Sequence, residues 1–198
     1  MKRSRFISLA AVTAAVFLSS CWLPEDFDAK VLIAPDGSYT FSYEGVLSNI
    51  LALEAISKDA FTEENDAEVR EQGAELKKEP GFTAVDYLGR GRFKVSVRLD
   101  KPAGETCHFL SKDIKLFSME TGEDKTLSVT SFSLEEKDLE SLRTIGGRTW
   151  GTFTVQVPNK LKVLSANADK KQKEGKTAKN YIWHIDDPLT AASIVVKW

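Results

Sequence analysis

Short runs of alternating apolar residues, separated by turn residues, constrain the fold of this chain more than any other feature of its sequence. The period of two recurs in residues 27–33, 39–43, 87–99, 148–157 and 181–198. This period places successive side chains on opposite faces of a β-strand. Because the strands cluster as hairpins with helical segments between them, the sequence predicts an α+β fold on a curved antiparallel sheet.

Three segments between the strands have helical patterns. Residues 46–56 are apolar around almost the whole helical wheel, which predicts a buried helix. Residues 62–78 are highly charged, with Thr62 as a cap, and predict a surface helix. A capping pattern at Ser133 begins a third, short helix. We expect the buried helix to lie in the concavity of the sheet.

The longest strand pattern, 87–99, combines an apolar face with a basic one. Gly89 and Gly91 lie on the apolar face and predict a bend in a single strand. The opposite face carries a basic stripe of four residues, Arg90, Arg92, Lys94 and Arg98. These side chains are candidates for binding phosphate or carboxylate groups of a lipid or a protein partner. The alternative is a solvated strand face, balanced by carboxylates on the neighbouring strands.

The N-terminus has the order of an export signal. Lys2, Arg3 and Arg5 precede an apolar run over 6–18, which two serines follow before Cys21. A run of about 13 apolar residues is shorter than the ~20 that a membrane span requires. A basic start and a small-residue exit are typical of a segment that is removed after export. The alternative is a buried N-terminal helix.

The residues Leu18-Ser19-Ser20-Cys21 resemble the lipobox of bacterial lipoprotein precursors. The resemblance implies a signal peptide over 1–20, cleavage before Cys21, and lipidation of Cys21 with several acyl chains such as palmitate, which anchor a protein stably. We expect a tether over 21–26 and a single domain over 27–198. Residue 22 is Trp, not the aspartate that retains such proteins in the inner membrane of enteric-type bacteria. The resemblance therefore implies an outer-membrane protein that faces the periplasm.

Charge and cysteine usage narrow the class of protein further. Loss of three basic residues with the signal would change the net charge from -2 to about -5. An acidic domain is poorly suited to neutralising phosphates, so we expect no nucleic acid partner. Lipidation of Cys21 would leave Cys107 without a disulfide partner. Cys107 is then either a buried small side chain or a thiol that is reactive or forms an intermolecular bond.

Residues that could carry catalysis are few. The sequence has no nucleophile elbow, zinc-protease helix, Walker loop or dinucleotide fingerprint, and we expect neither metal nor cofactor. His108 follows Cys107, and His184 lies in a strand pattern. Asp186 and Asp187 precede a proline and are interpreted as turn residues that bind the local backbone. We therefore expect a non-enzymatic protein; the alternative is a hydrolytic enzyme whose catalytic residues come from distant positions.

The later half of the chain adds two further hypotheses. A lysine-rich segment, 169–179, is expected to be a loop that either is simply solvated or contacts an anionic membrane near the tether. The early hairpin, the helices, and the strand 181–185 with its following turn and final strand resemble the LppM-type lipoproteins. This resemblance implies a role in binding lipid or another envelope component. The sequence thus predicts a membrane-tethered envelope lipoprotein that binds a protein or lipid partner.

Overall fold

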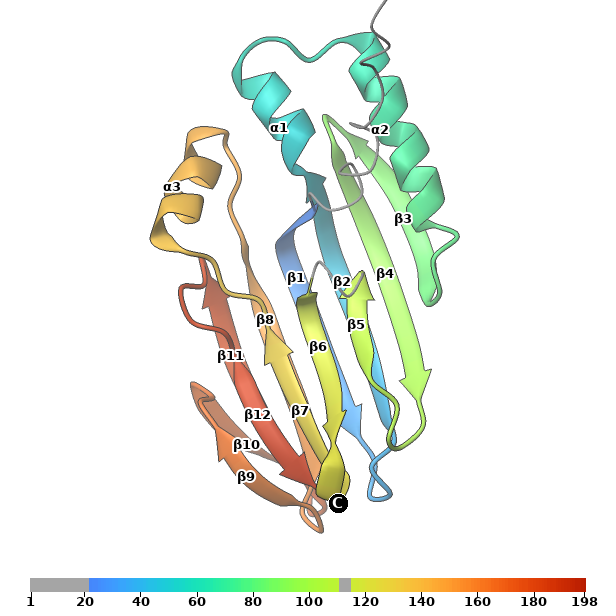
Figure 1. Ribbon diagram of the computed structural model, residues 1–198, viewed down its shortest axis with the longest axis vertical. Coiled ribbons are helices and arrows are strands. Elements are labelled where there is room, and N and C mark those ends of the chain that lie inside the picture. Colours follow the sequence, from blue (N-terminus) through green and yellow to red (C-terminus); the bar gives the residue numbers. More distant parts are fainter. Residues whose placement is uncertain (1–21, 111–114) are drawn as a thin grey trace, which may run out of the picture.

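The computed structural model describes residues 22–110 and 115–198 and confirms the α+β class (Figure 1). Among these residues, no helix has both the length and the apolar character needed to cross a membrane. The strands form two sheets instead of the expected single one. The larger sheet has seven strands, in the spatial order β10 (Lys170–Glu174), β11 (Ala178–Asp186), β8 (Trp150–Pro158), β1 (Trp22–Ile33), β2 (Tyr39–Asn49), β4 (Arg92–Lys101) and β3 (Phe82–Gly89).

The second sheet has five strands and packs against the first. Its order is β5 (Cys107–Leu110), β6 (Lys115–Gly122), β7 (Thr126–Ser131), β12 (Ser193–Lys197) and β9 (Lys162–Ala166). Three α-helices, α1 (Ile50–Ser57), α2 (Glu63–Leu76) and α3 (Glu136–Thr144), and the 3-10 turn Glu123–Lys125 complete the described elements. All strand pairs are antiparallel except β1 and β8. The chain builds β5–β7 and α3 before it returns to the first sheet at β8, next to β1.

Aromatic side chains, and not a helix, fill the space between the two sheets. The Phe117 ring of β6 is fully buried, with its centroid 4.9 Å from Phe153, 5.6 Å from Phe27 and 5.8 Å from Phe41. Such ring pairs add about 0.5–1.5 kcal/mol each beyond the area that they bury. The inward faces of both sheets therefore form one continuous core.

The predicted buried helix over 46–56 is wrong in extent and in place. Residues 46–49 belong to β2, and only Ala52 and Leu53 of α1 are buried. The Asn49 side chain accepts a hydrogen bond from the Ala52 amide at 2.9 Å and so ends the strand and caps the helix. A strand that is buried up to its last residue, joined directly to a short apolar helix, gives the same sequence pattern as one long buried helix.

The predicted surface helix over 62–78 is confirmed as α2. The Thr62 side chain accepts from the Asn65 amide at 3.2 Å, and the Asn65 side chain accepts from the Thr62 amide in return. The helix packs through Val69, Gly73 and Leu76. A Cβ on Gly73 would lie 2.1 Å from the Phe93 ring, so this glycine allows α2 to approach β4 closely.

The predicted single strand over 87–99 is two strands joined by a tight turn. Gly89, Arg90 and Gly91 all have positive φ, between 53° and 92°, and the chain reverses there from β3 into β4. The glycines therefore do not bend one strand but form the turn of a hairpin. Consequently Arg90 lies in the turn and not on the strand face with Arg92, Lys94 and Arg98.

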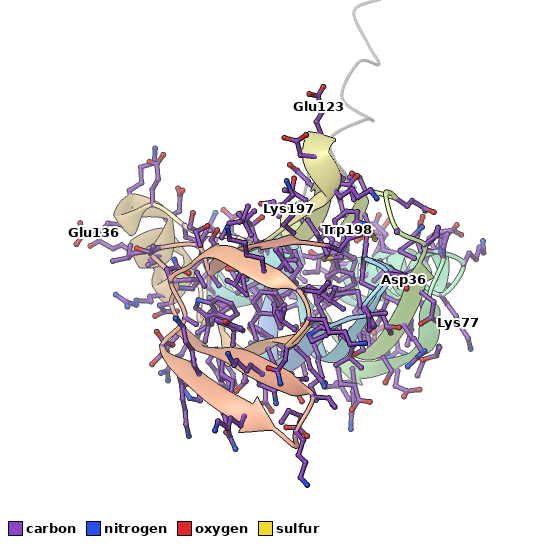
Figure 2. All side chains as sticks on the ribbon, turned by 90° about the horizontal axis from the view of Figure 1, so that it is seen from below. Asp36, Lys77, Glu123, Glu136, Lys197 and Trp198 are labelled. Atoms are coloured by element: carbon purple, nitrogen blue, oxygen red, sulfur yellow. The ribbon has the colours of Figure 1, made fainter. Side chains whose placement is uncertain are left out.

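The two ends of the molecule differ in structure. The helix-bearing end comprises the start of β1 at Trp22, α1, α3, the β3–β4 turn and the segment around Trp150 and Leu189 (Figure 1). The turn-bearing end comprises the β1–β2 turn over 34–38, the β10–β11 turn at Gly175 and the C-terminal Trp198. Figure 2 views the molecule from the turn-bearing end and shows Asp36, Lys197 and Trp198 there.

The lysine-rich segment is not the expected loop. Residues 170–174 form β10, the edge strand that pairs with β11, and every side chain of β10 is exposed. Lysines on an exposed edge oppose pairing with a strand of another molecule. The turn that follows β10 lies at the turn-bearing end, opposite the end at which β1 starts.

Candidate functional site

The start of β1 corrects the prediction of a tether over 21–26. Trp22 is the first residue of β1, pairs with Asn49 of β2, and is 8% exposed. Its ring meets the Phe93 ring edge-on at a centroid distance of 5.6 Å. Residues 23–25 are buried as well, and only Asp26, at a bulge with φ of 44°, is exposed. The apolar residues that follow Cys21 are thus part of the folded domain. Cys21 itself lies outside the described residues.

A second small core fixes the same end of the molecule. Leu23 of β1, Leu53 of α1 and Leu142 of α3 are all buried in one cluster. Gly147 allows the close approach, because a Cβ there would lie 3.1 Å from the Leu23 side chain. Two helices that are distant in sequence, α1 and α3, therefore pack against the start of β1 at Leu23.

The four residues of the basic stripe differ in their ion-pair partners and in their exposure. Arg92 donates from Nε to Glu25 Oε2 at 3.0 Å, and the Glu25 side chain is only 6% exposed. Arg98 binds Asp100 on the same strand face, with Nη2 3.0 Å from Oδ1. Lys94 is exposed and lies opposite Asp86 of β3, while Arg90 is exposed in the β3–β4 turn. The structure brings Arg92, Lys94 and Arg98 to one face of β4, with a carboxylate near each.

Glu25 is a buried carboxylate that sequence reasoning missed. Its Oε1 has no hydrogen-bond partner among the described residues, and the neighbouring Ser48 Oγ has none either. A buried ionised group needs its partner, so Arg92 has a structural role in addition to its charge. Extending the apolar alternation of residues 27–33 back by two positions could have indicated that Glu25 is buried. No sequence pattern indicates its partner Arg92, which lies 67 residues later.

Asp186 and Asp187 form ion pairs with two arginines, and the four side chains line a shallow pocket of about 300 Å³. Asp187 Oδ2 accepts from Arg143 Nη2 at 2.8 Å, and Asp187 Oδ1 accepts from the Thr149 amide at 3.3 Å. Asp186 pairs with Arg148 at 3.0 Å. The aspartates therefore join α3 to the two strands β8 and β11, and do not only stabilise their own turn. Because both arginines are already paired, this pocket presents little free charge.

Exposed Trp150 lies beside this pocket, and the sequence contained a signal for it. Gly151, Phe153 and Val155 alternate toward the core, which places Trp150 on the outer face. Arg148 lies over the indole at 5.8 Å from its centroid. Tryptophan with an apolar body and a polar edge is enriched where a protein meets a membrane interface.

The two histidines occupy separate surfaces. His108 Nδ1 lies 3.0 Å from Ser118 Oγ and 3.9 Å from Glu120 Oε1. Ser118 is 2% exposed, and a nucleophile must be able to reach its substrate. His184 is exposed on β11, and its backbone amide donates to Asp169 at 2.7 Å. Within the described ranges, no three metal-ligating side chains gather.

Cys107 is buried in the core at the start of β5. Burial is the main cause that raises the pKa of its thiol above the usual value. A raised pKa leaves little thiolate near neutral pH, and the thiolate is the reactive form. Of the two alternatives for Cys107, the structure supports the buried small side chain.

The comparisons with known proteins include a solved structure of low similarity. The sequence matches no family model and no curated protein. Among solved structures, the NMR structure of the folded domain of the Mycobacterium tuberculosis LppM protein is similar to this chain over 94% of both chains, with 12% sequence identity. The TM-score of this comparison is 0.37, which is too low to establish a common fold.

Proposed function

We propose that this protein is a non-enzymatic envelope lipoprotein, anchored through a lipid on Cys21, which presents a rigid domain for binding a protein or lipid partner. The observation that carries the proposal is the position of Trp22, the residue that follows the lipobox-like cysteine. The lipobox-like residues place the cleavage directly before Cys21, and Trp22 is already buried and paired with Asn49 in the sheet. Cleavage there would remove the apolar run and leave the described domain complete.

The binding role is supported by the packing of the interior. Aromatic rings in tilted and edge-on contact occupy the space between the two sheets, which is where a lipid carrier would hold an apolar ligand. Binding through the outer surface is therefore the form of interaction that this packing favours. The non-enzymatic role is supported by the partners of the candidate catalytic groups. Asp186 and Asp187 are ion-paired with arginines, and the hydroxyl that meets His108 belongs to a buried serine.

Further parts of the proposal concern location. An outer-membrane position facing the periplasm rests on Trp22 at the residue after the lipid cysteine, where the inner-membrane retention signal would be aspartate. The exposed cations Arg90, Lys94 and Arg98 remain candidates for contact with an anionic partner. Arg92 is less available because it is the partner of buried Glu25.

Mass spectrometry of the full-length protein, expressed in a bacterium and extracted with detergent, tests the anchor. We expect a mature chain that begins at Cys21 and carries the added mass of a diacylglyceryl group and an acyl chain. The variant Cys21→Ser should accumulate as an uncleaved precursor without lipid. A control variant, Cys107→Ser, should mature normally. A protein that keeps residues 1–20, or that matures unchanged in the Cys21→Ser variant, would refute the anchor.

A further inference from the structure

The attachment point has no spacer between it and the folded domain. Consecutive Cα atoms are 3.8 Å apart, so Cys21 lies within one residue of the buried, strand-paired Trp22. A lipid on Cys21 would therefore keep the start of β1, and with it the helix-bearing end, at the membrane surface. This orientation rests on the proposed function, since it requires the lipid on Cys21.

Exposed apolar side chains are concentrated at the same end. Among the described residues, six large hydrophobic side chains are exposed. The strand register places four of them, Leu51, Leu88, Trp150 and Leu189, at the helix-bearing end. Single exposed apolar residues are normal on a protein surface, but four of these six lie at the end that carries the attachment point.

Each of the four residues is placed at this end by a neighbour of known position. Leu51 follows Asn49, the strand partner of Trp22. Trp150 pairs with Asp186, and the next residue of β8 pairs with Phe27 of β1. Leu88 precedes the β3–β4 turn, and Leu189 follows the last residues of β11. These residues therefore lie at the same end of the molecule as the start of β1, on four different segments.

Charge at this end is mixed, with Arg90 as an exposed cation in the β3–β4 turn and acidic or paired groups on the other elements. The first turn of α2 carries Glu63, Glu64 and Asp66, and the arginines Arg143 and Arg148 are paired with aspartates. The lysines of β10 lead to the turn-bearing end, away from the attachment. Contact with a membrane here depends on apolar side chains and on the interfacial preference of Trp150.

We infer that the helix-bearing end lies on the bilayer that holds Cys21, with Leu51, Leu88, Trp150 and Leu189 in the lipid interface. The turn-bearing end, with the β10 lysines and the C-terminus, then points away from that membrane and is open to a partner (Figure 2). Because the contact is apolar, it should form on uncharged lipids and should not weaken in salt.

The test uses the full-length lipidated protein in phosphatidylcholine vesicles that contain nitroxide-labelled lipid. A fluorophore is attached to single cysteines, Leu51→Cys, Leu189→Cys or Leu164→Cys, in a Cys107→Ala background. Leu164 of β9 is the matched control, because its exposure of 48% lies between the 43% of Leu51 and the 59% of Leu189. We expect several-fold stronger quenching at positions 51 and 189 than at 164. This difference should be unchanged in salt of about 0.5 M, an ionic strength that screens surface charges.

Two controls separate the orientation from the anchor. Vesicle flotation reports the anchor alone: protein that does not float refutes the lipid and the orientation together. Protein that floats but is quenched equally at all three positions refutes the orientation only. Inserting about 20 Gly/Ser residues between Cys21 and Trp22 gives the domain a reach of roughly 25 Å, and should equalise the three signals without affecting flotation. Unequal quenching that survives the spacer would overturn the role of the short attachment.

Discussion

The helix-bearing end and the turn-bearing end of this domain are held together by different interactions. At the helix-bearing end, Trp22, Phe93 and α2 pack closely, and a buried carboxylate, Glu25, is paired with Arg92. At the turn-bearing end, the side-chain hydrogen bonds are exposed or only partly buried, as where the Asp36 side chain accepts from Ser38 and the Tyr39 hydroxyl donates to the Glu105 carbonyl. The difference suggests that one end is built to hold a fixed position and the other to remain accessible. Substitutions matched between the two ends can test it.

The largest loss of stability is expected on removal of the Phe93 ring, which contacts several elements at the helix-bearing end. Phe93 of β4 is buried and contacts Trp22, Tyr87 and the backbone of α2 at Gly73. Phe93→Ala should lower the free energy of unfolding by about 3–5 kcal/mol, because it leaves a cavity between β4 and α2. Trp198→Ala, the counterpart at the turn-bearing end, removes a partly exposed ring and should cost about 1–2 kcal/mol. Urea denaturation measures both; equal losses would remove the difference between the ends.

The two arginines on one face of β4 provide the next comparison. Arg92→Gln leaves the Glu25 carboxylate buried without its partner and should cost about 2–3 kcal/mol. Arg98→Gln removes an exposed pair with Asp100 and should cost less than about 0.5 kcal/mol. The double variant Glu25→Gln with Arg92→Gln should recover part of the loss, measured again by urea denaturation. Equal costs at positions 92 and 98 would contradict a structural role for Arg92.

A smaller difference in stability is expected between alanine substitutions of two glycines, one in a turn at each end. Gly91 has a φ of 77°, and a Cβ there would lie 2.4 Å from the Ala52 Cβ of α1. Gly91→Ala should therefore cost about 2–3 kcal/mol from strain and overpacking together. Gly175 has a φ of 57° and no heavy atom within 4 Å of the added Cβ, so Gly175→Ala should cost about 1–2 kcal/mol from strain alone. Thermal unfolding compares the two, and a cost at position 175 that equals that at 91 would exclude the contact with α1.

The smallest effect concerns pH. The hydrogen bond from the Tyr87 hydroxyl and the bond from Arg70 hold the pKa of the Asp66 carboxyl below its usual value of 3.8. A lowered folded-state pKa stabilises the fold above the unfolded-state pKa, and this contribution is lost as the pH falls through the folded-state pKa. Asp66→Asn should thus be slightly less stable than the wild type at pH 7. The difference should disappear in strong acid; a difference that persists there would show that the carboxylate charge is not its cause.

The sequence predicted local structure well wherever one pattern belonged to one element. Thr62 and the charges that follow it indicated α2, and the aromatic alternation of 39–43 indicated the core face of β2. It failed where two elements joined without a polar break. Residues 46–57 contain the end of a buried strand and a short helix, and residues 82–101 contain two strands whose turn includes Arg90.

The features of the helix-bearing end were harder to predict because they depend on pairs that are distant in the chain. Arg143 and Asp187 are separated by 44 positions, and Glu25 and Arg92 by 67. No single-sequence pattern links such residues. The tether was predicted incorrectly because Pro24 suggested a short spacer. In the structure, the backbone pairing of Trp22 with Asn49 extends the sheet to that point.

Neutron reflectometry of the lipidated protein on a supported bilayer tests most directly whether the helix-bearing end faces the membrane. β1 has 12 residues and helices lie beyond its start, so a domain standing on this end should form a layer with a height on the order of 50 Å. We predict that this layer begins at the headgroups without an intervening layer of water. A hydrated gap between headgroups and protein, or a layer only about half as high, would contradict the account.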